Sequence, residues 1–413
     1  MRKLFSISFT LLCLLGLIAL SPVSALALTA SNTQIINNAS MSYNDGVSVK
    51  TANATPVVVT VTLIQGQPTI SKGPDQTTPY TGNNTPLTNT FTITASNTNG
   101  PDTYSLTPAI TATVNASGSS VALASITPLG GPQTSPVTLG ATVTLGGSTS
   151  TILNVPSDGA SDGKVNEIAV NDWIVVNGDT ANPRQVSGIS DNAIGISTIT
   201  VAPALAAGAP AAGLLVAEQK TVTMTVLSGT ITAAGQSISI TKHLTITSTT
   251  DVTKTAVTTD ITDTFTSGLA TLTKYVRNVT AVPTMAGTGT KYTYGGTDYW
   301  PSGITAKPGE VLEYILVANN SGTGIVSLAA ITDTLPTTYV TLKTGAYAGA
   351  KDFTYFNESG TPSYLTAGAG DDAATYASPT LTINVGTGAT SGAGGNIASG
   401  STVRALYQVT VNL

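Results

Sequence analysis

The sequence is short of charge. Only 9% of its 413 residues are Asp, Glu, Lys or Arg, whereas ordinary soluble domains carry about 25%. The 16 basic residues are thinly spread and the net charge is −5, which excludes the clustered Lys and Arg that bind phosphate backbones. We therefore expect no nucleic-acid partner. Because 41% of the residues are hydrophobic, the low charge is not that of a disordered chain.

Cysteine and histidine are almost absent. The chain has one of each, Cys13 and His243. A metal site or a catalytic triad would therefore lack most of the side chains that usually build it. His243 lies in an alternating apolar segment, and we interpret it as a histidine on the surface of a strand. We expect no enzymatic activity, no catalytic residue and no cofactor-binding residue.

The first 27 residues have the pattern of a secretory signal peptide. Arg2 and Lys3 precede an apolar run over residues 11–20, and Ala25-Leu26-Ala27 supplies a small-residue cleavage site. The run is shorter than the roughly 20 residues of a membrane-spanning helix, so we expect no transmembrane segment in the mature chain. The pattern predicts a secreted protein, extracellular or at a cell surface, which would lose Cys13 and contain no disulfide.

From residue 30 onward, Thr, Val and Ile alternate with a period of two. Residues 90–94 and 221–226 are examples, and runs rich in Gly, Asn, Pro and Asp separate such segments. This pattern predicts strands joined by short turns, and no segment has a helical period. We therefore expect an all-β fold of tandem Ig-like antiparallel β-sandwiches with a small inserted β subdomain.

A weak internal repeat supports more than one sandwich. Residues 93–100 align with residues 315–322, and in each copy a strand leads into an Asn- and Gly-containing turn. A second similarity relates residues 261–264 to residues 331–334. Repeats of this kind indicate duplicated structural units.

These signals predict the following organisation: a signal peptide over 1–27, a strand pair over 28–66, an Ig-like sandwich over 67–255 with an insert near 150–212, a linker over 256–270, and an Ig-like domain over 271–413. An isolated hairpin is marginally stable in water. The strands of 28–66 must therefore pair with a neighbouring sheet, either of the same chain or of a neighbouring subunit.

A family resemblance is carried by residues 307–322 and 331–336. They contain, in order, a Pro-Gly turn, an alternating strand, an Asn-x-Gly turn and an Asp-Thr-Leu-Pro strand end. This resembles the conserved-repeat domain, an Ig-like module of unknown function in prokaryotic cell-surface proteins. The resemblance covers 271–413 well and 67–110 weakly. It implies an extracellular structural or adhesive module, and it brings no catalytic residues.

The acidic loops leave calcium as the one candidate cofactor. Asp158 and Asp162 lie in a loop with two Asp-Gly pairs, and calcium binds the oxygens of such carboxylates and of nearby carbonyls. The alternative is a pair of solvated turns, because Asp-Gly is a common turn pair.

An internal Lys–Asn isopeptide bond is a second hypothesis, since some Ig-like surface domains are cross-linked in this way. Lys274 shares the strand phase of its apolar neighbours and Glu313 shares that of Val311, so both would need a buried partner or a reaction. Asn412, the proposed acceptor, lies in the phase opposite to Val411, which weakens the hypothesis.

The leading functional hypothesis is a secreted structural cell-surface protein. It would associate with copies of itself, or with other surface proteins, into a filament, sheath or surface layer by β-strand addition, because charged residues that protect strand edges are scarce. The alternative is an adhesin or glycan-binding module that uses the 150–212 insert, with Trp173, Tyr299 and Trp300 as candidate stacking residues. A glycan is thus a further candidate ligand. A secreted hydrolase would need an acid–base pair that the sequence does not reveal.

Overall fold

The computed structural model describes residues 29–127, 135–281, 283 and 285–413. The predicted signal peptide, 1–27, lies outside the described residues. Within them, all regular secondary structure is β, and no helix is long and apolar enough to span a membrane. The all-β prediction is confirmed.

The strands, in chain order, are β1 (Gln34–Asn37), β2 (Ser40–Asn44), β3 (Val49–Asn53), β4 (Val57–Thr60), β5 (Thr69–Lys72), β6 (Thr77–Pro79), β7 (Pro86–Thr94), β8 (Asp102–Val114), β9 (Ala116–Ser117), β10 (Ser120–Thr127), β11 (Val137–Leu139), β12 (Ala141–Val143), β13 (Ile152–Pro156), β14 (Trp173–Val176), β15 (Arg184–Ser190), β16 (Ile196–Ala202), β17 (Leu215–Leu227), β18 (Thr230–Ile231), β19 (Ile238–Ser248), β20 (Thr255–Val257), β21 (Ile261–Thr266), β22 (Ala270–Asn278), β23 (Tyr292–Tyr294), β24 (Thr297–Tyr299), β25 (Val311–Asn320), β26 (Val326–Thr334), β27 (Val340–Leu342), β28 (Phe353–Phe356), β29 (Pro362–Leu365), β30 (Ala374–Ala377), β31 (Thr380–Asn384), β32 (Gly395–Ile397) and β33 (Thr402–Val411).

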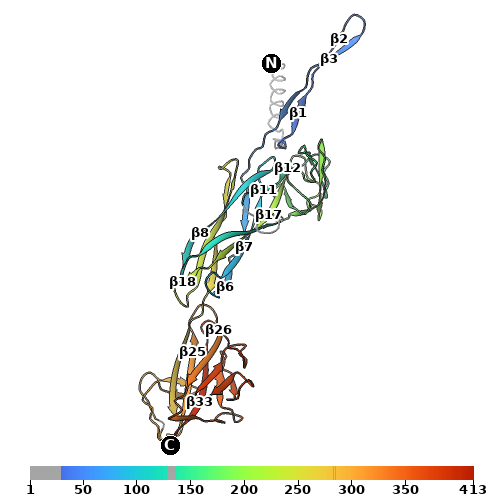
Figure 1. Ribbon diagram of the computed structural model, residues 1–413. Helices are drawn as coiled ribbons and strands as arrows, with labels where there is room; N and C mark the ends of the chain where they lie inside the picture. Colours follow the sequence, from blue (N-terminus) through green and yellow to red (C-terminus); the bar gives the residue numbers. More distant parts are fainter. Residues whose placement is uncertain (1–28, 128–134, 282, 284) are drawn as a thin grey trace, which may run out of the picture.

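These strands form three parts that follow one another along an elongated molecule (Figure 1). A two-stranded ribbon, built from β1 to β4, projects from one end. A first sandwich with a lateral insert occupies the middle, and a second sandwich ends the molecule at the C-terminus.

The first sandwich packs a nine-stranded sheet against a six-stranded one. The order of the larger sheet is β13-β16-β15-β14-β17-β7-β5, with β10 and β12 also paired to β17. The order of the smaller is β11-β8-β19-β21-β6, with β20 also paired to β19. Along β19 every second residue is buried, because the period-two sequence places Ile and Leu on the face that meets the other sheet. Phe91, Val222 and Leu244 lie in the resulting core.

The insert extends the larger sheet instead of forming a detached subdomain. β14 pairs with β17, and β15, β16 and β13 follow outward. The insert also has a core of its own, with Leu153, Ile174 and Ile199 fully buried.

The second sandwich packs the sheet β22-β25-β33-β28-β29 against the four-stranded sheet β30-β31-β26-β32. β25 lies between β22 and β33. As its two apolar phases predict, it is packed on both faces: Leu316 belongs to the main core, and Ile315 packs under Tyr299 of the β23–β24 hairpin.

The connection between the sandwiches is shorter than the predicted linker, 256–270. β21 and most of β20 lie within that range but are paired with β19 in the first sandwich, because Ile261 and Phe265 are buried in its core. Only residues 267–269 connect the two sandwiches. Leu269 N donates to Asn320 Oδ1 at 3.0 Å and Gly324 N donates to Ser267 O at 2.8 Å, so the connection is held in place.

The repeated turns have equivalent places in the two sandwiches. Each leads from a strand, β7 or β25, and each contacts the segment of chain that enters its sandwich. A Cβ on Gly322 would overlap the backbone of Ser267 and Leu269, and a Cβ on the aligned Gly100 would overlap Ser31. Glycine suits both turns because another backbone passes close to Gly322 and the side chain of Ser31 lies against Gly100.

Candidate functional site: the N-terminal ribbon

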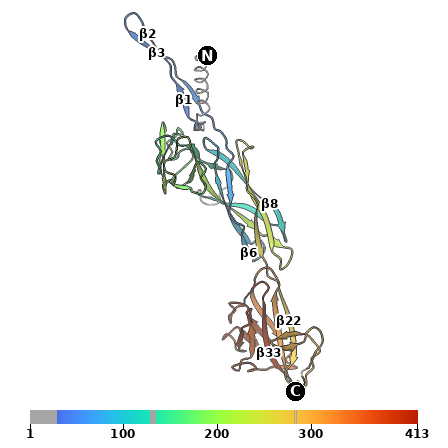
Figure 2. The ribbon, with the colours of Figure 1, turned by 180° about the vertical axis from the view of Figure 1, so that it is seen from behind.

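The N-terminal ribbon, residues 34–60, is one long hairpin that stands clear of the first sandwich (Figure 2). β1 pairs with β4 and β2 pairs with β3. Asp45 closes the turn, since its Oδ1 accepts the backbone N–H groups of Val47 and Ser48. At about 3.3 Å per residue, each arm is roughly 36 Å long.

All residues in the four ribbon strands are exposed, yet both faces of the β1–β4 half carry apolar side chains. Ile36 lies opposite Val58, and the neighbouring pair of Ile35 and Val59 points to the other face. Each of these four side chains is about half exposed. An antiparallel sheet in water normally has one polar face, so this ribbon presents surface that is suited to burial on both sides.

The ribbon carries only two charges, Asp45 and Lys50, which lie 3.7 Å apart near the turn. Natural edge strands are usually protected against pairing by charged side chains, proline or bulges. The Val57–Thr60 arm has none of these within the strand.

The base of the ribbon is fixed by Asn99, which lies in the repeated turn of the first sandwich. Its side-chain Nδ2 donates to Thr29 O at 2.9 Å and Thr62 O at 3.0 Å, and its Oδ1 accepts from Ile64 N at 2.7 Å. Ser31 N also donates to Asn99 O. In the part of the chain that the structure describes, the strand pair predicted at 28–66 is thus held to its own sandwich at its base and nowhere else.

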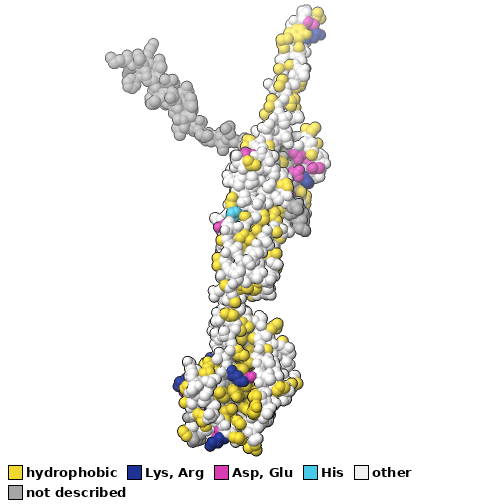
Figure 3. Space-filling view, turned by 60° about the vertical axis from the view of Figure 1, so that its left-hand side comes forward, with side chains coloured by type: hydrophobic (Ala, Val, Ile, Leu, Met, Phe, Trp, Pro, Cys, Tyr) yellow, Lys and Arg dark blue, Asp and Glu magenta, His cyan; other side chains and the backbone are white. Residues whose placement is uncertain are grey.

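An apolar groove lies at the other end of the molecule. A pocket of about 300 Å³ opens in the second sandwich between β27 and the edge strand β30, and Val340, Leu342, Ala367 and Tyr376 line it. Figure 3 shows hydrophobic side chains gathered both on the ribbon and over a face of this sandwich.

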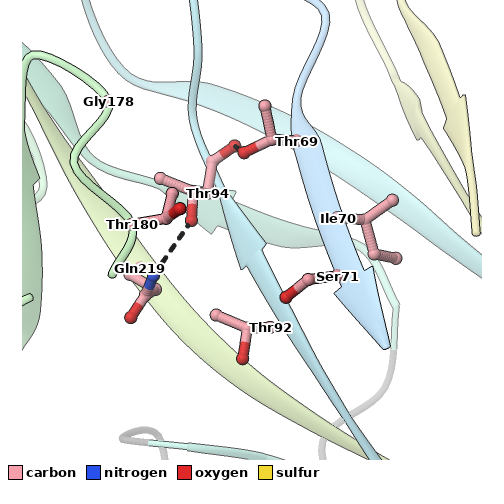
Figure 4. A pocket seen from close by; sticks show the side chains of 8 residues that line it. All are labelled: Thr69, Ile70, Ser71, Thr92, Thr94, Gly178, Thr180 and Gln219. Atoms are coloured by element: carbon pink, nitrogen blue, oxygen red, sulfur yellow. Dashed lines mark hydrogen bonds between the residues drawn. The ribbon is translucent and has the colours of Figure 1, made fainter. Parts of the chain in front are cut away.

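A second pocket, of about 290 Å³, lies where β5, β7 and β17 meet a loop of the insert (Figure 4). Its lining is mainly hydroxyl and amide groups, and Gln219 Nε2 donates to Thr94 Oγ1 at 3.4 Å. None of the described residues that line it carries an acid, a base or a thiol, so these residues offer hydrogen bonds but no acid–base chemistry.

The carboxylates of the two calcium candidates accept hydrogen bonds from backbone N–H groups. Asp158 accepts from Ala160 N at 3.0 Å and from Asn166 N at 2.7 Å, and Asp162 accepts from Lys164 N at 3.1 Å. The part of the chain that the structure describes holds no group of three or more His, Cys, Asp or Glu suited to a metal. Calcium binding stays a prediction, to be tested by calorimetric melting with calcium and with chelator.

The three isopeptide candidates are not brought together. Lys274 pairs with Asp333 at 2.6 Å on one face of β25, whereas Glu313 lies on the other face and accepts from Arg277 Nε at 2.6 Å. Asn412 donates to Thr337 O at the end of the second sandwich. Neighbouring positions of a strand point to opposite faces, so this assignment is corrected: these residues cannot react with one another in this fold.

Glu313 is instead a buried carboxylate whose oxygens accept several hydrogen bonds. It is 3% exposed and also accepts from Tyr299 Oη at 2.9 Å, Tyr347 Oη at 3.1 Å and Gln408 Nε2 at 2.9 Å. Burial, together with the charge of Glu313, raises the pKa of both tyrosines. The cluster has the partners that a buried charge needs.

Two buried ion pairs of the first sandwich were missed from the sequence. Lys242 pairs with Asp263, and Lys220 pairs with Glu218. The alternation of apolar and polar residues does indicate that Lys242 is buried, because Lys242 shares the phase of Ile240 and Leu244. A lysine in the apolar phase of a long strand predicts a buried cation. By contrast, His243 is on the surface as expected, with Nδ1 3.3 Å from Asp260 Oδ1.

No family model and no curated protein matches the sequence. Among solved structures, the C-terminal domain of the Streptococcus agalactiae AgI/II polypeptide BspA aligns over 84% of this chain and 91% of its own, with 10% identity and a TM-score of 0.28. A structure named BspA_C_mut aligns over 85% and 92%, with 11% identity and a TM-score of 0.29. No residue role is carried over from these alignments, and the resemblance to the conserved-repeat domain stays a prediction.

Proposed function

We propose that the protein is a secreted structural component of a cell surface, without enzymatic activity, that assembles head to tail through its N-terminal ribbon. The observation that supports this proposal is the ribbon itself: it has exposed apolar side chains on both faces, is nearly uncharged and, among the described residues, is attached to its sandwich at its base. A free hairpin of this kind is marginally stable in water. Packing against a second copy would bury both faces and supply partners for its edges.

The acceptor in this proposal is the groove between β27 and β30 of a second copy. Its apolar lining suits the Val and Ile side chains of the ribbon. Among the described residues, both flanking strands have a side with no strand paired to it. The ribbon projects from one end of the molecule, and the second sandwich, which contains the groove, forms the other end (Figure 1). A contact between two different surfaces of one chain produces an open filament when its rotation does not close a ring.

Substitutions at the two surfaces test the proposal. Val58→Lys places a charge on one ribbon face, and Tyr376→Lys places one at the groove. Burying a Val side chain contributes roughly 1.5–3 kcal/mol, so each variant should weaken self-association by about 10–100-fold in sedimentation velocity. The matched controls are Val252→Lys and Tyr364→Lys, at exposed sites outside both surfaces. Equal weakening by the controls would refute the assignment.

The insert supports adhesion as a second candidate function. Trp173 is 41% exposed on β14, and a pocket of about 220 Å³ beside this strand is lined by Asp179, Asn182, Arg184 and Leu205. Trp173 does not line this pocket, so its exposed indole is by itself the stacking candidate for a sugar ring. Tyr299, in contrast, is buried against Ile315. Glycan-array binding by the full chain that is lost in Trp173→Ala would favour adhesion over assembly.

A further inference from the structure

Three polar side chains meet inside the first sandwich, where the alternating pattern would place apolar ones. Lys242 and Asp263 are 0% exposed and Asn89 is 2% exposed. They come from three strands: Lys242 from β19, Asp263 from the adjacent β21, and Asn89 from β7 in the facing sheet. The cluster therefore spans the two layers of the sandwich.

One carboxylate holds both of the other groups. Lys242 Nζ donates to Asp263 Oδ2, and Asn89 Nδ2 donates to Asp263 Oδ1 at 3.0 Å. Because the two oxygens belong to one carboxylate, the amine and the carboxamide are immediate neighbours. Asn89 Oδ1 is buried and has no hydrogen-bond partner among the described residues. An unpaired buried carbonyl is costly. As three unlinked side chains, the cluster therefore leaves one buried acceptor without a hydrogen bond.

The surroundings favour a nucleophilic amine. Phe91 follows Asn89 on the inward face of β7, and Ile240 and Leu244 flank Lys242 on β19. Burial lowers the pKa of the Lys242 ammonium, while Asp263 partly restores it. Transfer of one proton from Lys242 to Asp263 yields a neutral amine and a neutral acid, which are the less costly forms in an apolar core.

We propose that Lys242 and Asn89 form an internal amide bond, with Asp263 as the proton carrier. The lone pair of the neutral Nζ attacks Asn89 Cγ and forms the Nζ–Cγ bond. Asp263 gives its proton to Nδ2 and takes one from Nζ. The Cγ–Nδ2 bond then breaks, its electron pair leaves with the nitrogen, and ammonia departs. One amide replaces another, so no oxidant, reductant or cofactor is needed.

The other buried or partly buried lysine pairs lack the third member. Glu218, the partner of Lys220, accepts from Lys220 and from Gly140 N but from no carboxamide. Asp333, the partner of Lys274, accepts from Lys274 and Tyr407 Oη. Within the described residues, only the Lys242 pair also holds an asparagine side chain, and this confines the reaction to one site.

The bond would join the two sheets of a sandwich that has no cysteine. It would connect β7 with β19 and close a covalent loop from residue 89 to residue 242. A cross-link between distant residues restricts the unfolded chain and thereby stabilises the fold. The inference is independent of the proposed assembly, because it concerns the interior of a single chain.

Mass spectrometry of the purified, denatured full chain tests the inference. With the N-terminus determined by sequencing, the intact mass should be lower than the sequence mass by one ammonia. Proteolysis should release a branched fragment that contains both Asn89 and Lys242. An intact mass equal to the sequence mass, with unlinked fragments, would overturn the proposal and leave an ordinary ion pair.

Variants assign the bond to its residues. Asn89→Ala, Lys242→Met and Asp263→Ala should each have their full sequence mass, and the melting temperature of the first sandwich should fall. Lys220→Met and Lys274→Ala, which alter the other two pairs, should keep the ammonia deficit. A deficit that persists in Asn89→Ala would overturn the assignment. If a variant does not fold, the presence or absence of the branched fragment in the chain without substitutions still tests whether the bond forms.

Discussion

At the scale of single residues, the first sandwich places ionisable groups in a core that is otherwise apolar. Glu218 is fully buried beside Lys220, and its Oε2 accepts from Gly140 N at 2.7 Å. Burial raises the pKa of Glu218 to about 7, although the Lys220 charge opposes this. A carboxyl group that holds its proton more tightly in the folded state makes stability depend on pH.

The sign of this dependence follows from the two states. Between about pH 4.5 and 7 the folded protein keeps the Glu218 proton that the unfolded chain has lost, so the free energy of unfolding falls as pH rises. The difference amounts to roughly 3 kcal/mol. In Glu218→Gln this part of the slope should vanish in denaturant unfolding of the first sandwich. Glu167→Gln, at an exposed pair with Lys164, should keep the slope, and a slope that persists in Glu218→Gln would refute the assignment.

At the scale of elements, the base of the ribbon depends on the close approach of the Ser31 side chain to the backbone of Gly100. A Cβ at Gly100 would overlap the buried Ser31. Gly100→Ala should therefore loosen the base by roughly 1–3 kcal/mol, the usual cost of overpacking, without unfolding the sandwich.

Hydrogen exchange measures this loosening directly. The amides of Ser31 and Ile64, which are bound to Asn99, should exchange about 10–100-fold faster in Gly100→Ala. Gly146→Ala is the control, because a Cβ there meets no atom within 4 Å. Unchanged exchange at both amides would show that the base does not rely on this glycine.

The alternation of apolar and polar residues was sufficient to predict most elements. It identified β7, β17, β19 and β25 and the sandwiches that they form, because side-chain phase in a strand is a local property. It also placed a strand pair ahead of the first sandwich. The linker was drawn too long because pairing partners are not local: β21 is short, and only its pairing with β19 assigns it to the first sandwich.

The side-chain clusters were harder to predict for the same reason. Lys274 and Asn412 were linked because some Ig-like surface domains are cross-linked in this way, although the strand phase of Asn412 already weakened the hypothesis, and the two residues lie apart in the second sandwich. Lys242 and Asn89 come together because β19 and β7 lie in facing sheets, and no spacing along the sequence records that arrangement. What the sequence did contain was a lysine and an asparagine in apolar phases, each of which indicates a buried polar partner.

At the scale of the whole molecule, the scarcity of charged residues has its clearest consequence at the N-terminal ribbon. The ribbon holds two of the charged residues, and its apolar side chains are exposed on both faces. An isolated molecule with such a surface would be prone to uncontrolled edge pairing. In the proposed filament the same surface is buried in every copy except the last, and the groove at the opposite end receives it.

Electron microscopy of the mature protein, with and without residues 34–60, tests the central claim most directly. The deletion joins Thr33 to Val61 through an Asn-Gly turn and leaves the contacts of Asn99 with residues 29–31 and 62–64 in place. We expect head-to-tail filaments from the full chain and single elongated particles from the deletion variant. Filaments that persist without the ribbon, or a full chain that stays monomeric at every concentration, would contradict the account.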